Sequence, residues 1–123
     1  MINPLNATTE VRSLLIADDT IKSFVTSKIY PIVAPEGTDG DFIFYQRDGT
    51  KTEETKEGIS DVSVTVNVGV VSESYFSSQQ IAMAIYKCLV GDYTGDISKI
   101  RLQDSTEDIV DKKYIQILQF TIK

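Results

Sequence analysis

Acidic side chains gather at three places in the sequence, and paired carboxylates are the residues here that could do chemistry. The clusters are Asp39/Asp41, Glu53/Glu54/Glu57 and Asp104/Glu107/Asp108/Asp111. Paired carboxylates can act as general acid and base in glycoside hydrolysis, or bind Ca²⁺ or Mg²⁺. Such a site needs rigid, partly desolvated groups with shifted pKa values. All three clusters fall in expected loops among Lys, Ser and Thr, so we interpret them as solvated surface charge.

The other residue types that carry catalysis are sparse. The chain of 123 residues has no histidine and one cysteine, Cys88, which excludes His-based triads, His zinc ligands and an internal disulfide. No serine lies in a GxSxG motif, and no GxxxxGK[ST] or GxGxxG phosphate loop occurs. Cys88 adjoins an apolar stripe without a neighbouring basic cluster, so we expect a buried, unreactive thiol. The sequence predicts no enzyme, no cofactor and no metal site.

The charge balance narrows the classes of partner. A net charge of −6 disfavours tight binding to nucleic acid and to anionic membranes. No stretch reaches the roughly 20 apolar residues of a membrane span. Residues 1–10 lack the basic segment and apolar run of a secretory signal. We expect one domain over residues 1–123, in the compartment where it is made.

Two segments have the apolar spacing of helices. The first is expected to begin at Thr8 or Thr9; Asp18 and Asp19 interrupt its stripe, which leaves one long helix or two short ones open. Its apolar residues are Val11, Leu14, Leu15, Ile21, Phe24 and Val25. The second runs from about Tyr75 to Leu89 after a cap at Ser72 or Ser74, with Gly91 where a C-terminal glycine is expected. Its apolar side carries Phe76, Ile81, Ile85 and Leu89.

Five segments have the composition of β-strands. The clearest is 62–70, where five valines alternate with Ser63, Thr65, Asn67 and Gly69, so one face is expected in the core and the other is polar. Residues 28–33 contain Pro31 and are expected at a sheet edge or in an irregular extended segment. The remaining strands are expected at 42–47, 97–103 and 113–122, with an acidic connection at 104–113.

Residues 48–61 form the most polar stretch. They are rich in Lys, Glu and Thr, with Gly49 and Gly58 near the two ends. Almost no apolar area is available to offset the entropy of ordering each residue, roughly 1–2 kcal/mol. We therefore expect the exposed distal part of a long hairpin, or a mobile hairpin loop.

The order of elements is α-β-β-β-α-β-β. Three hairpin-linked strands, a helix and a final hairpin favour an α+β fold, in which a mainly antiparallel sheet of about five strands carries two helices on one face.

Read in this order, nearly the whole chain resembles the tail-completion, or tail-terminator, proteins of long-tailed bacteriophages and prophages, which include tail-to-head joining proteins. The segments that carry the resemblance are VRSLLIADDTIKSFVTSKIYPIVAPEG (11–37), FIFYQRDGT (42–50), VSVTVNVGVVSESYFSSQQIAMAIYKCL (62–89) and IRLQDSTEDIVDKKYIQILQFTIK (100–123). The segments are strand patterns and turns, and their order and spacing carry the weight.

The resemblance implies a structural, non-catalytic role in the virion. Such proteins form a hexameric ring at the head-proximal end of the tail after synthesis in the host cytoplasm. The ring ends the tail tube and contacts the tube protein and the head connector protein. DNA passes through the lumen without specific binding. Six copies of a chain with net charge −6 carry −36, which suits a channel that must not hold a polyanion.

The interaction residues that we expect fall into two groups. The assembly loop comprises Thr50, Lys51, Glu53, Glu54, Lys56, Glu57 and Gly58, ordered on contact with the tube or connector; the alternative is a plain solvated loop. The candidate subunit interface comprises Ile29, Tyr30 and Ile32 on the edge segment, with Ile115 and Ile117 on the second face of the last strand. The two isoleucines of the last strand could instead pack under the first helix.

A different class of function stays open at this point. A non-catalytic cellular binding module could recruit a partner by strand addition, with the edge at residues 28–33 as the receptor.

Overall fold

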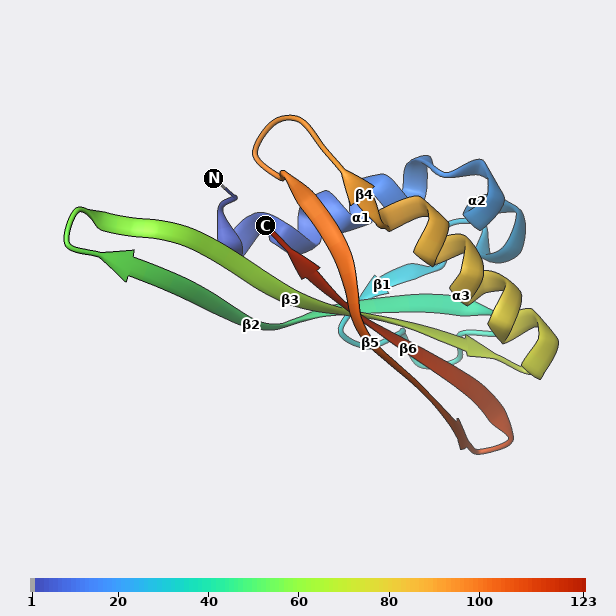
Figure 1. Ribbon diagram of the computed structural model, residues 1–123. Coiled ribbons are helices and arrows are strands. Elements are labelled where there is room, and N and C mark those ends of the chain that lie inside the picture. Colours follow the sequence, from blue (N-terminus) through green and yellow to red (C-terminus); the bar gives the residue numbers. More distant parts are fainter. Residues whose placement is uncertain (1) are drawn as a thin grey trace.

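The computed structural model describes residues 2–123 as a twisted sheet with helices on one face (Figure 1). The elements are η1 (Pro4–Asn6), α1 (Ala7–Ala17), α2 (Asp19–Val25), β1 (Ile29–Pro31), β2 (Phe42–Thr55), β3 (Gly58–Ser72), α3 (Tyr75–Leu89), β4 (Gly91–Asp92), β5 (Lys99–Val110) and β6 (Lys113–Ile122). Over these residues the sheet has six strands in the order β1-β2-β3-β6-β5-β4. The α+β class is therefore as predicted, with one more strand and one more helix than expected.

The first helical segment divides at Asp18. This residue has extended backbone angles, and its Oδ1 accepts a hydrogen bond of 2.9 Å from the Ile21 N–H, which caps α2. Of the two possibilities that the sequence left open, two short helices is the correct one. The expected start at Thr8 or Thr9 is wrong, because the 3-10 turn at Pro4–Asn6 leads directly into α1 at Ala7.

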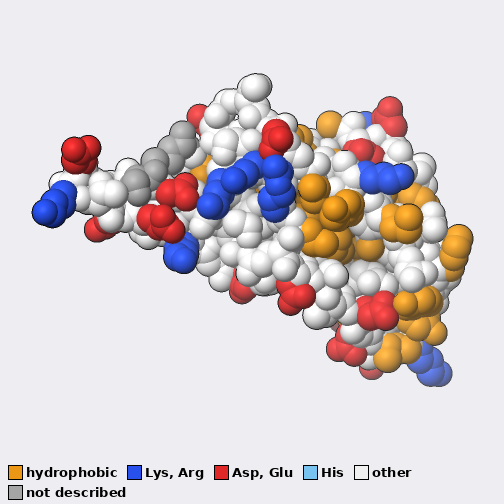
Figure 2. Space-filling view, viewed as in Figure 1, with side chains coloured by type: hydrophobic (Ala, Val, Ile, Leu, Met, Phe, Trp, Pro, Cys, Tyr) orange, Lys and Arg blue, Asp and Glu red, His pale blue; other side chains and the backbone are white. Residues whose placement is uncertain are grey.

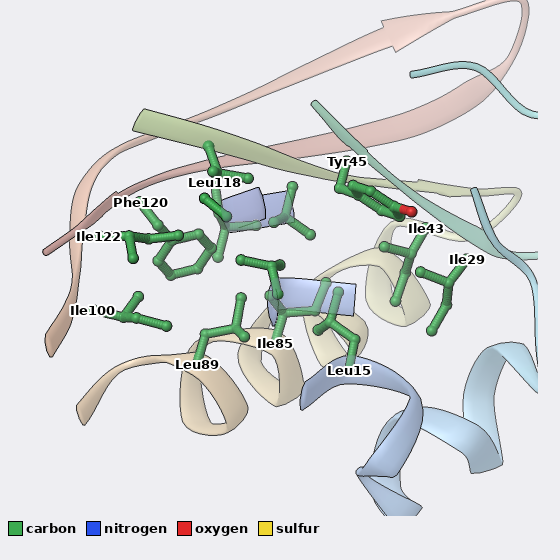
Figure 3. Close-up of a cluster of buried hydrophobic side chains, with 14 of the residues drawn as sticks. Leu15, Ile29, Ile43, Tyr45, Ile85, Leu89, Ile100, Leu118, Phe120 and Ile122 are labelled. Carbon is green, nitrogen blue, oxygen red and sulfur yellow. The ribbon is translucent and has the colours of Figure 1, made fainter. Parts of the chain in front are cut away.

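The core lies between the sheet and the helices. Val62, Val64, Val66, Val68 and Val70 are all buried, in one cluster with Ile81, Ile85 and Leu89 of α3, as the alternating pattern predicted. Figure 3 shows side chains of β6, β5 and β2 converging on those of α3 and α1. Burial of an aliphatic side chain of this size contributes roughly 1.5–3 kcal/mol, so this cluster supplies most of the stability.

Two details of α3 differ from the prediction. Phe76 is 68% exposed, because it lies in the first turn and points away from the sheet side that Ile81 occupies. Gly91 does not end the helix: Val90 leaves it in an extended conformation, and Gly91 begins β4. The Ser74 cap is confirmed, since its Oγ accepts from the Ser77 N–H at 3.4 Å.

The pairing of β1 also differs from the prediction. β1 is parallel to β2, with Ile29 opposite Ile43, whereas a hairpin would make the two strands antiparallel. The reason is the connection at residues 32–41. Ile32 has φ 66° and turns the chain at the end of β1, and the following residues return it to the start of β2.

The expected acidic connection at 104–113 is mostly strand. β5 continues to Val110, and only Asp111 and Lys112 form the turn, both at positive φ (50° and 64°), as a tight hairpin requires. Pairing with apolar β6 overrides the weak strand propensity of the acidic residues. The pairing of β5 with β6 has a register shift between Leu102 and Asp104. Before the shift β5 contributes the buried Ile100, and after it the residues of β5 are exposed.

Candidate assembly surfaces

The β2–β3 hairpin extends well beyond the body of the molecule. We call residues 46–59 the distal ribbon: every one of them is exposed, yet β2 and β3 stay paired as far as Thr55 and Gly58 (Figure 1). Of the two alternatives for the polar segment, the structure has the exposed distal part of a long hairpin. Ladder pairing supplies the order that burial does not. The expected assembly residues, from Thr50 to Gly58, all lie on this ribbon.

Local residues explain why the ribbon forms. Thr50, Thr52 and Thr55 are β-branched and favour extended backbone. At the tip, the Thr55 Oγ1 donates to the Gly58 carbonyl oxygen and accepts from the Glu57 N–H, both at 3.3 Å. Gly58 has φ 118°, a value that side chains disfavour.

Contacts at its base attach the ribbon to the body. The Arg47 Nη1 donates to the Pro4 carbonyl oxygen at 3.4 Å, and Lys123 lies 3.3 Å from Asp61. β6 pairs with β3 from Val64 to Ser72 and goes no further toward the tip. Two-stranded ribbons without a covered face are marginal in water. The ribbon is thus a surface that gains order from any partner that covers it.

The expected interface residues on β1 differ in their positions. Ile29 is buried in the core of its own chain and offers no contact surface. Tyr30 is half-buried, with its ring edge-on to Phe42 at 6.3 Å between centroids. Ile32 is 62% exposed. Of the three, Ile32 has the side chain most exposed for contact with another subunit.

Ile115 and Ile117 lie on the sheet face away from the helices. They stand opposite Val71 and Gly69 of β3. The side chain of Leu118 points to the other face of the sheet, into the core. The alternative in which they pack under the first helix is therefore wrong. Both are half-buried, so part of their apolar surface stays in contact with solvent.

This second face is more apolar at one end than the sequence pattern indicates. A Cβ on Gly69 would collide with the Phe44 ring, so the missing side chain at Gly69 creates the space for that ring. Beside it, a hollow of about 380 Å³ opens between the 32–38 segment, Phe44 and Val71. The expected polar face of β3 is thus polar only at Ser63, Thr65 and Asn67.

The last strand, β6, is an inner strand of the sheet. β6 pairs with β3 on one side and with β5 on the other. The sheet ends at β1 on one side and at β4 on the other. β4 covers only Ile100 and Lys99 of β5.

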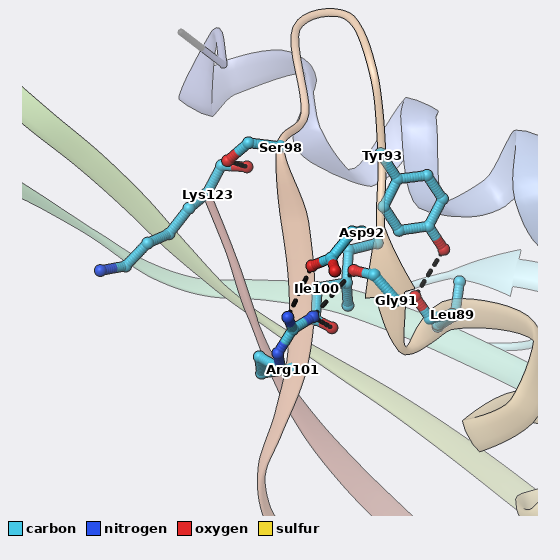
Figure 4. Close-up of polar contacts among 8 residues, drawn as sticks. All are labelled: Leu89, Gly91, Asp92, Tyr93, Ser98, Ile100, Arg101 and Lys123. Carbon is cyan, nitrogen blue, oxygen red and sulfur yellow. Dashed lines mark hydrogen bonds and ion pairs between the residues drawn. The ribbon is translucent and has the colours of Figure 1, made fainter.

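Polar contacts fix the base of β5 (Figure 4). The Arg101 guanidinium donates to Asp92 at 2.6 Å and to the Gly91 carbonyl oxygen at 2.9 Å, and it lowers the pKa of the Asp92 carboxyl. The Ser98 N–H donates to the carbonyl oxygen of Lys123 at 2.6 Å. The Tyr93 hydroxyl donates to the Leu89 carbonyl oxygen at 2.5 Å. The start of β5 is therefore well held, in contrast to its exposed distal part.

A second polar group holds the β5–β6 hairpin to the start of α3. The Tyr75 hydroxyl and the Gln116 amide donate to Glu107 at 3.0 and 3.1 Å, and the Tyr75 and Tyr114 rings meet edge-on. The hydrogen bond to Glu107 raises the pKa of Tyr75, which keeps the phenol protonated. These exposed contacts orient the hairpin and position no nucleophile.

Several apolar side chains of α3 and of the β5–β6 hairpin are exposed to solvent. Phe76, Met83 and Tyr86 project from α3, and Ile109 from β5. In Figure 2, hydrophobic side chains gather over the α3 half of the visible face, whereas the ribbon half carries charged ones.

The acidic clusters and Cys88 show no arrangement for catalysis. Two of the three clusters lie mostly on strands, with Glu57 and Asp111 in the turns, and all three are largely exposed. Within residues 2–123, no three His, Cys, Asp or Glu side chains are grouped to hold a metal ion. Cys88 is half-buried and donates to the Leu14 carbonyl oxygen at 3.4 Å, and burial is the main cause that raises its pKa to about 11. Its thiol is therefore uncharged and a weak nucleophile at neutral pH. None of the described helices has the length and apolarity to cross a membrane.

Comparison with known proteins shows a similarity in fold to a solved structure. No family model and no curated protein sequence matches the chain. Among solved structures, it is similar to a chain in the virion of a native gene transfer agent particle, with a TM-score of 0.75 and 17% identity. The match covers 91% of this chain and 90% of that chain. At this identity the similarity shows a shared fold over nearly the whole length of both proteins.

Proposed function

We propose that this protein is a structural subunit of a phage-type virion, and that it completes the tail by forming a hexameric ring at its head-proximal end. The observation that carries the proposal is the fold match to a virion chain across nine-tenths of both chains. The sequence resemblance to tail-completion proteins points to the same class independently of that match.

The surfaces of the subunit suit such a role. A ring that ends a tube needs one surface for the tube, one for the connector and two for its neighbours. The distal ribbon projects beyond the body, and apolar side chains stay exposed on α3 and on the second sheet face. In this proposal the ribbon contacts the tail tube protein or the head connector protein. The acidic charge of six copies keeps DNA from adhering in the lumen.

The competing function as a strand-addition module loses its expected receptor. β1 has only three residues, one of which is Pro31. Ile32 then leaves the strand direction at φ 66°. Peptide recognition by strand addition uses a continuous row of backbone donors and acceptors, which this short edge lacks.

The oligomeric state tests the proposal. Size-exclusion chromatography with light scattering, followed by negative-stain electron microscopy, is expected to give hexameric rings of the purified protein or monomers that form rings on added tail tubes. A protein that stays monomeric at high concentration, ignores tail tubes and binds extended peptides would contradict it and favour the binding module.

A further inference from the structure

The sheet has two long strand edges with which no other described strand of the chain pairs. On one side, β1 pairs with β2 only at Ile43, Phe44 and Tyr45, so no described strand pairs with the outer edge of β2 beyond Tyr45. On the other side, β4 stops at Ile100, which leaves the outer edge of β5 open over residues 102–110. Open edges of this length are templates for pairing with another chain.

The β5 edge is capped by its own side chains. The Ser105 N–H donates to Asp104 Oδ1 at 2.8 Å, and the Ile109 N–H donates to Asp108 Oδ1 at 2.7 Å. Ser105 and Ile109 are four residues apart, and alternate residues of an antiparallel strand direct their N–H groups to the same side. Both N–H groups therefore point away from β6. The carboxylates satisfy these donors while the subunit is free, which opposes indiscriminate aggregation.

The ladder register gives the same direction independently. The Ile43 N–H donates to the Lys28 carbonyl oxygen, so it points toward β1. One row of the sheet then runs from Ile43 through Val70 and Gln116 to Glu107. Directions alternate from pair to pair along such a row, so the Glu107 N–H points outward, as do those of Ser105 and Ile109 on either side.

The β2 edge can be assigned in the same way. The Tyr45 carbonyl oxygen accepts from the Ile32 N–H at 2.8 Å, so the backbone polar groups of Tyr45 also point to the outer edge of β2. Past the register shift at Arg47/Gly49, Thr50 and Thr52 stand opposite Val64 and Val62, which follow Val70 in steps of two residues along β3. The backbone N–H groups of Thr50 and Thr52 therefore point to the same outer edge as that of Ile43. Their N–H groups are the donors that the ribbon presents to a neighbour.

We propose that the outer edge of β5 pairs with the outer edge of β2 in a second copy of this chain, so that the sheets of neighbouring subunits join. The inference rests on the proposed function, which requires a ring. The two edges lie on opposite sides of one sheet, so the contact is head-to-tail and can repeat until the ring closes. Their open lengths are similar. Lys51 of the incoming strand lies on the same sheet face as Asp104 and Asp108 and attracts these carboxylates away from the backbone donors.

Two proline variants test the pairing from both sides. Ser105→Pro/Ile109→Pro removes outward donors of β5, and Thr50→Pro/Thr52→Pro removes those of β2. Each variant alone is expected to remain monomeric in light scattering at concentrations where the wild type forms rings. An equimolar mixture is expected to form heterodimers and no larger species, because one intact β2 edge meets one intact β5 edge.

Matched variants separate edge pairing from folding. Thr106→Pro removes a donor that points toward β6, so it is expected to lower the melting temperature, whereas Ser105→Pro is expected to leave the melting temperature near that of the wild type.

Three outcomes overturn the inference. If both double variants keep their melting temperature and still form rings, the edge pairing is wrong while the ring function stands. If both are monomeric but their mixture does not dimerise, the β2 edge is not the occupant. If the wild type itself never forms rings, alone or on tail tubes, the proposed function fails together with the inference.

Discussion

The β2–β3 hairpin contains two regions that are paired alike and buried differently. From Val62 to Val70, one face of β3 lies against the helices, and its valines are buried. From Gln46 to Ile59, the same hairpin is exposed on every residue. The first region holds the fold, whereas the second adds backbone pairing without burial. We therefore propose that its extension into solvent serves contact with a partner.

Magnitudes support this division. A buried valine contributes roughly 1.5–3 kcal/mol, whereas an exposed cross-strand pair contributes roughly 0.2–1 kcal/mol. Ordering each residue costs roughly 1–2 kcal/mol. Burial of the valines offsets the entropic cost of ordering the covered half. Cross-strand pairing in the ribbon does not exceed the entropic cost of ordering its residues. Changes in the two regions should therefore affect different measurements.

The largest expected effect is on the core half. Val66→Asp places an unpaired carboxylate at a fully buried position opposite Phe120. This substitution should lower the free energy of unfolding by several kcal/mol, on the order of the whole stability of a small domain. The expected result is an insoluble or unfolded protein. Ser63→Asp is the control, because Ser63 lies on the other face opposite Lys51. A soluble Val66→Asp protein with a cooperative thermal transition would contradict the assignment of faces.

A smaller loss of stability is expected on the second sheet face. Gly69→Ala forces the Phe44 ring to move, and such overpacking typically costs about 1–3 kcal/mol in chemical denaturation. Gly91→Ala is a matched control, since a Cβ there meets open space. Gly69→Ala should cost much less in a Phe44→Leu background than alone. Equal costs in both backgrounds would show that the ring does not need the space at Gly69.

A further prediction concerns pH and the half-buried Cys88. Its pKa, raised to about 11 mainly by burial, exceeds that of a free thiol, so the folded state holds the proton more tightly than the unfolded state. The contribution to stability is present below about pH 8.5 and is lost as the pH rises toward 11. Cys88→Ala should reduce this alkaline decline in melting temperature. Rapid reaction of folded wild type with a thiol reagent at pH 8 would contradict the assignment.

The sequence predicted the parts of the fold that burial determines. The valine alternation of β3 and the apolar stripe of α3 located the core, because both patterns report which residues leave water. The α2 cap at Asp18 was one of two possibilities because the interruption was visible in the stripe. The parallel pairing of β1 was not predictable, since it depends on the path of residues 32–41.

The interaction surfaces were less predictable, for a physical reason. Strand formation in the ribbon and in distal β5 depends on pairing with a partner strand, and acidic and threonine-rich segments give little local indication of it. Ile29 and Ile115 look equivalent in sequence, yet one is in the core and the other on the open face. The Asp104 and Asp108 caps could be found only in the structure, because they depend on which backbone donors face outward.

Deletion of the ribbon separates its role in assembly from its role in the fold. A variant that lacks Thr50 to Glu57, with Gly49 joined to Gly58, keeps the whole buried core and should melt within about 2 °C of the wild type. We expect this stable variant to form no rings on tail tubes and to join no tails to heads in a complementation assay scored by electron microscopy. A folded deletion variant that caps tubes and joins heads at the wild-type level would contradict the account.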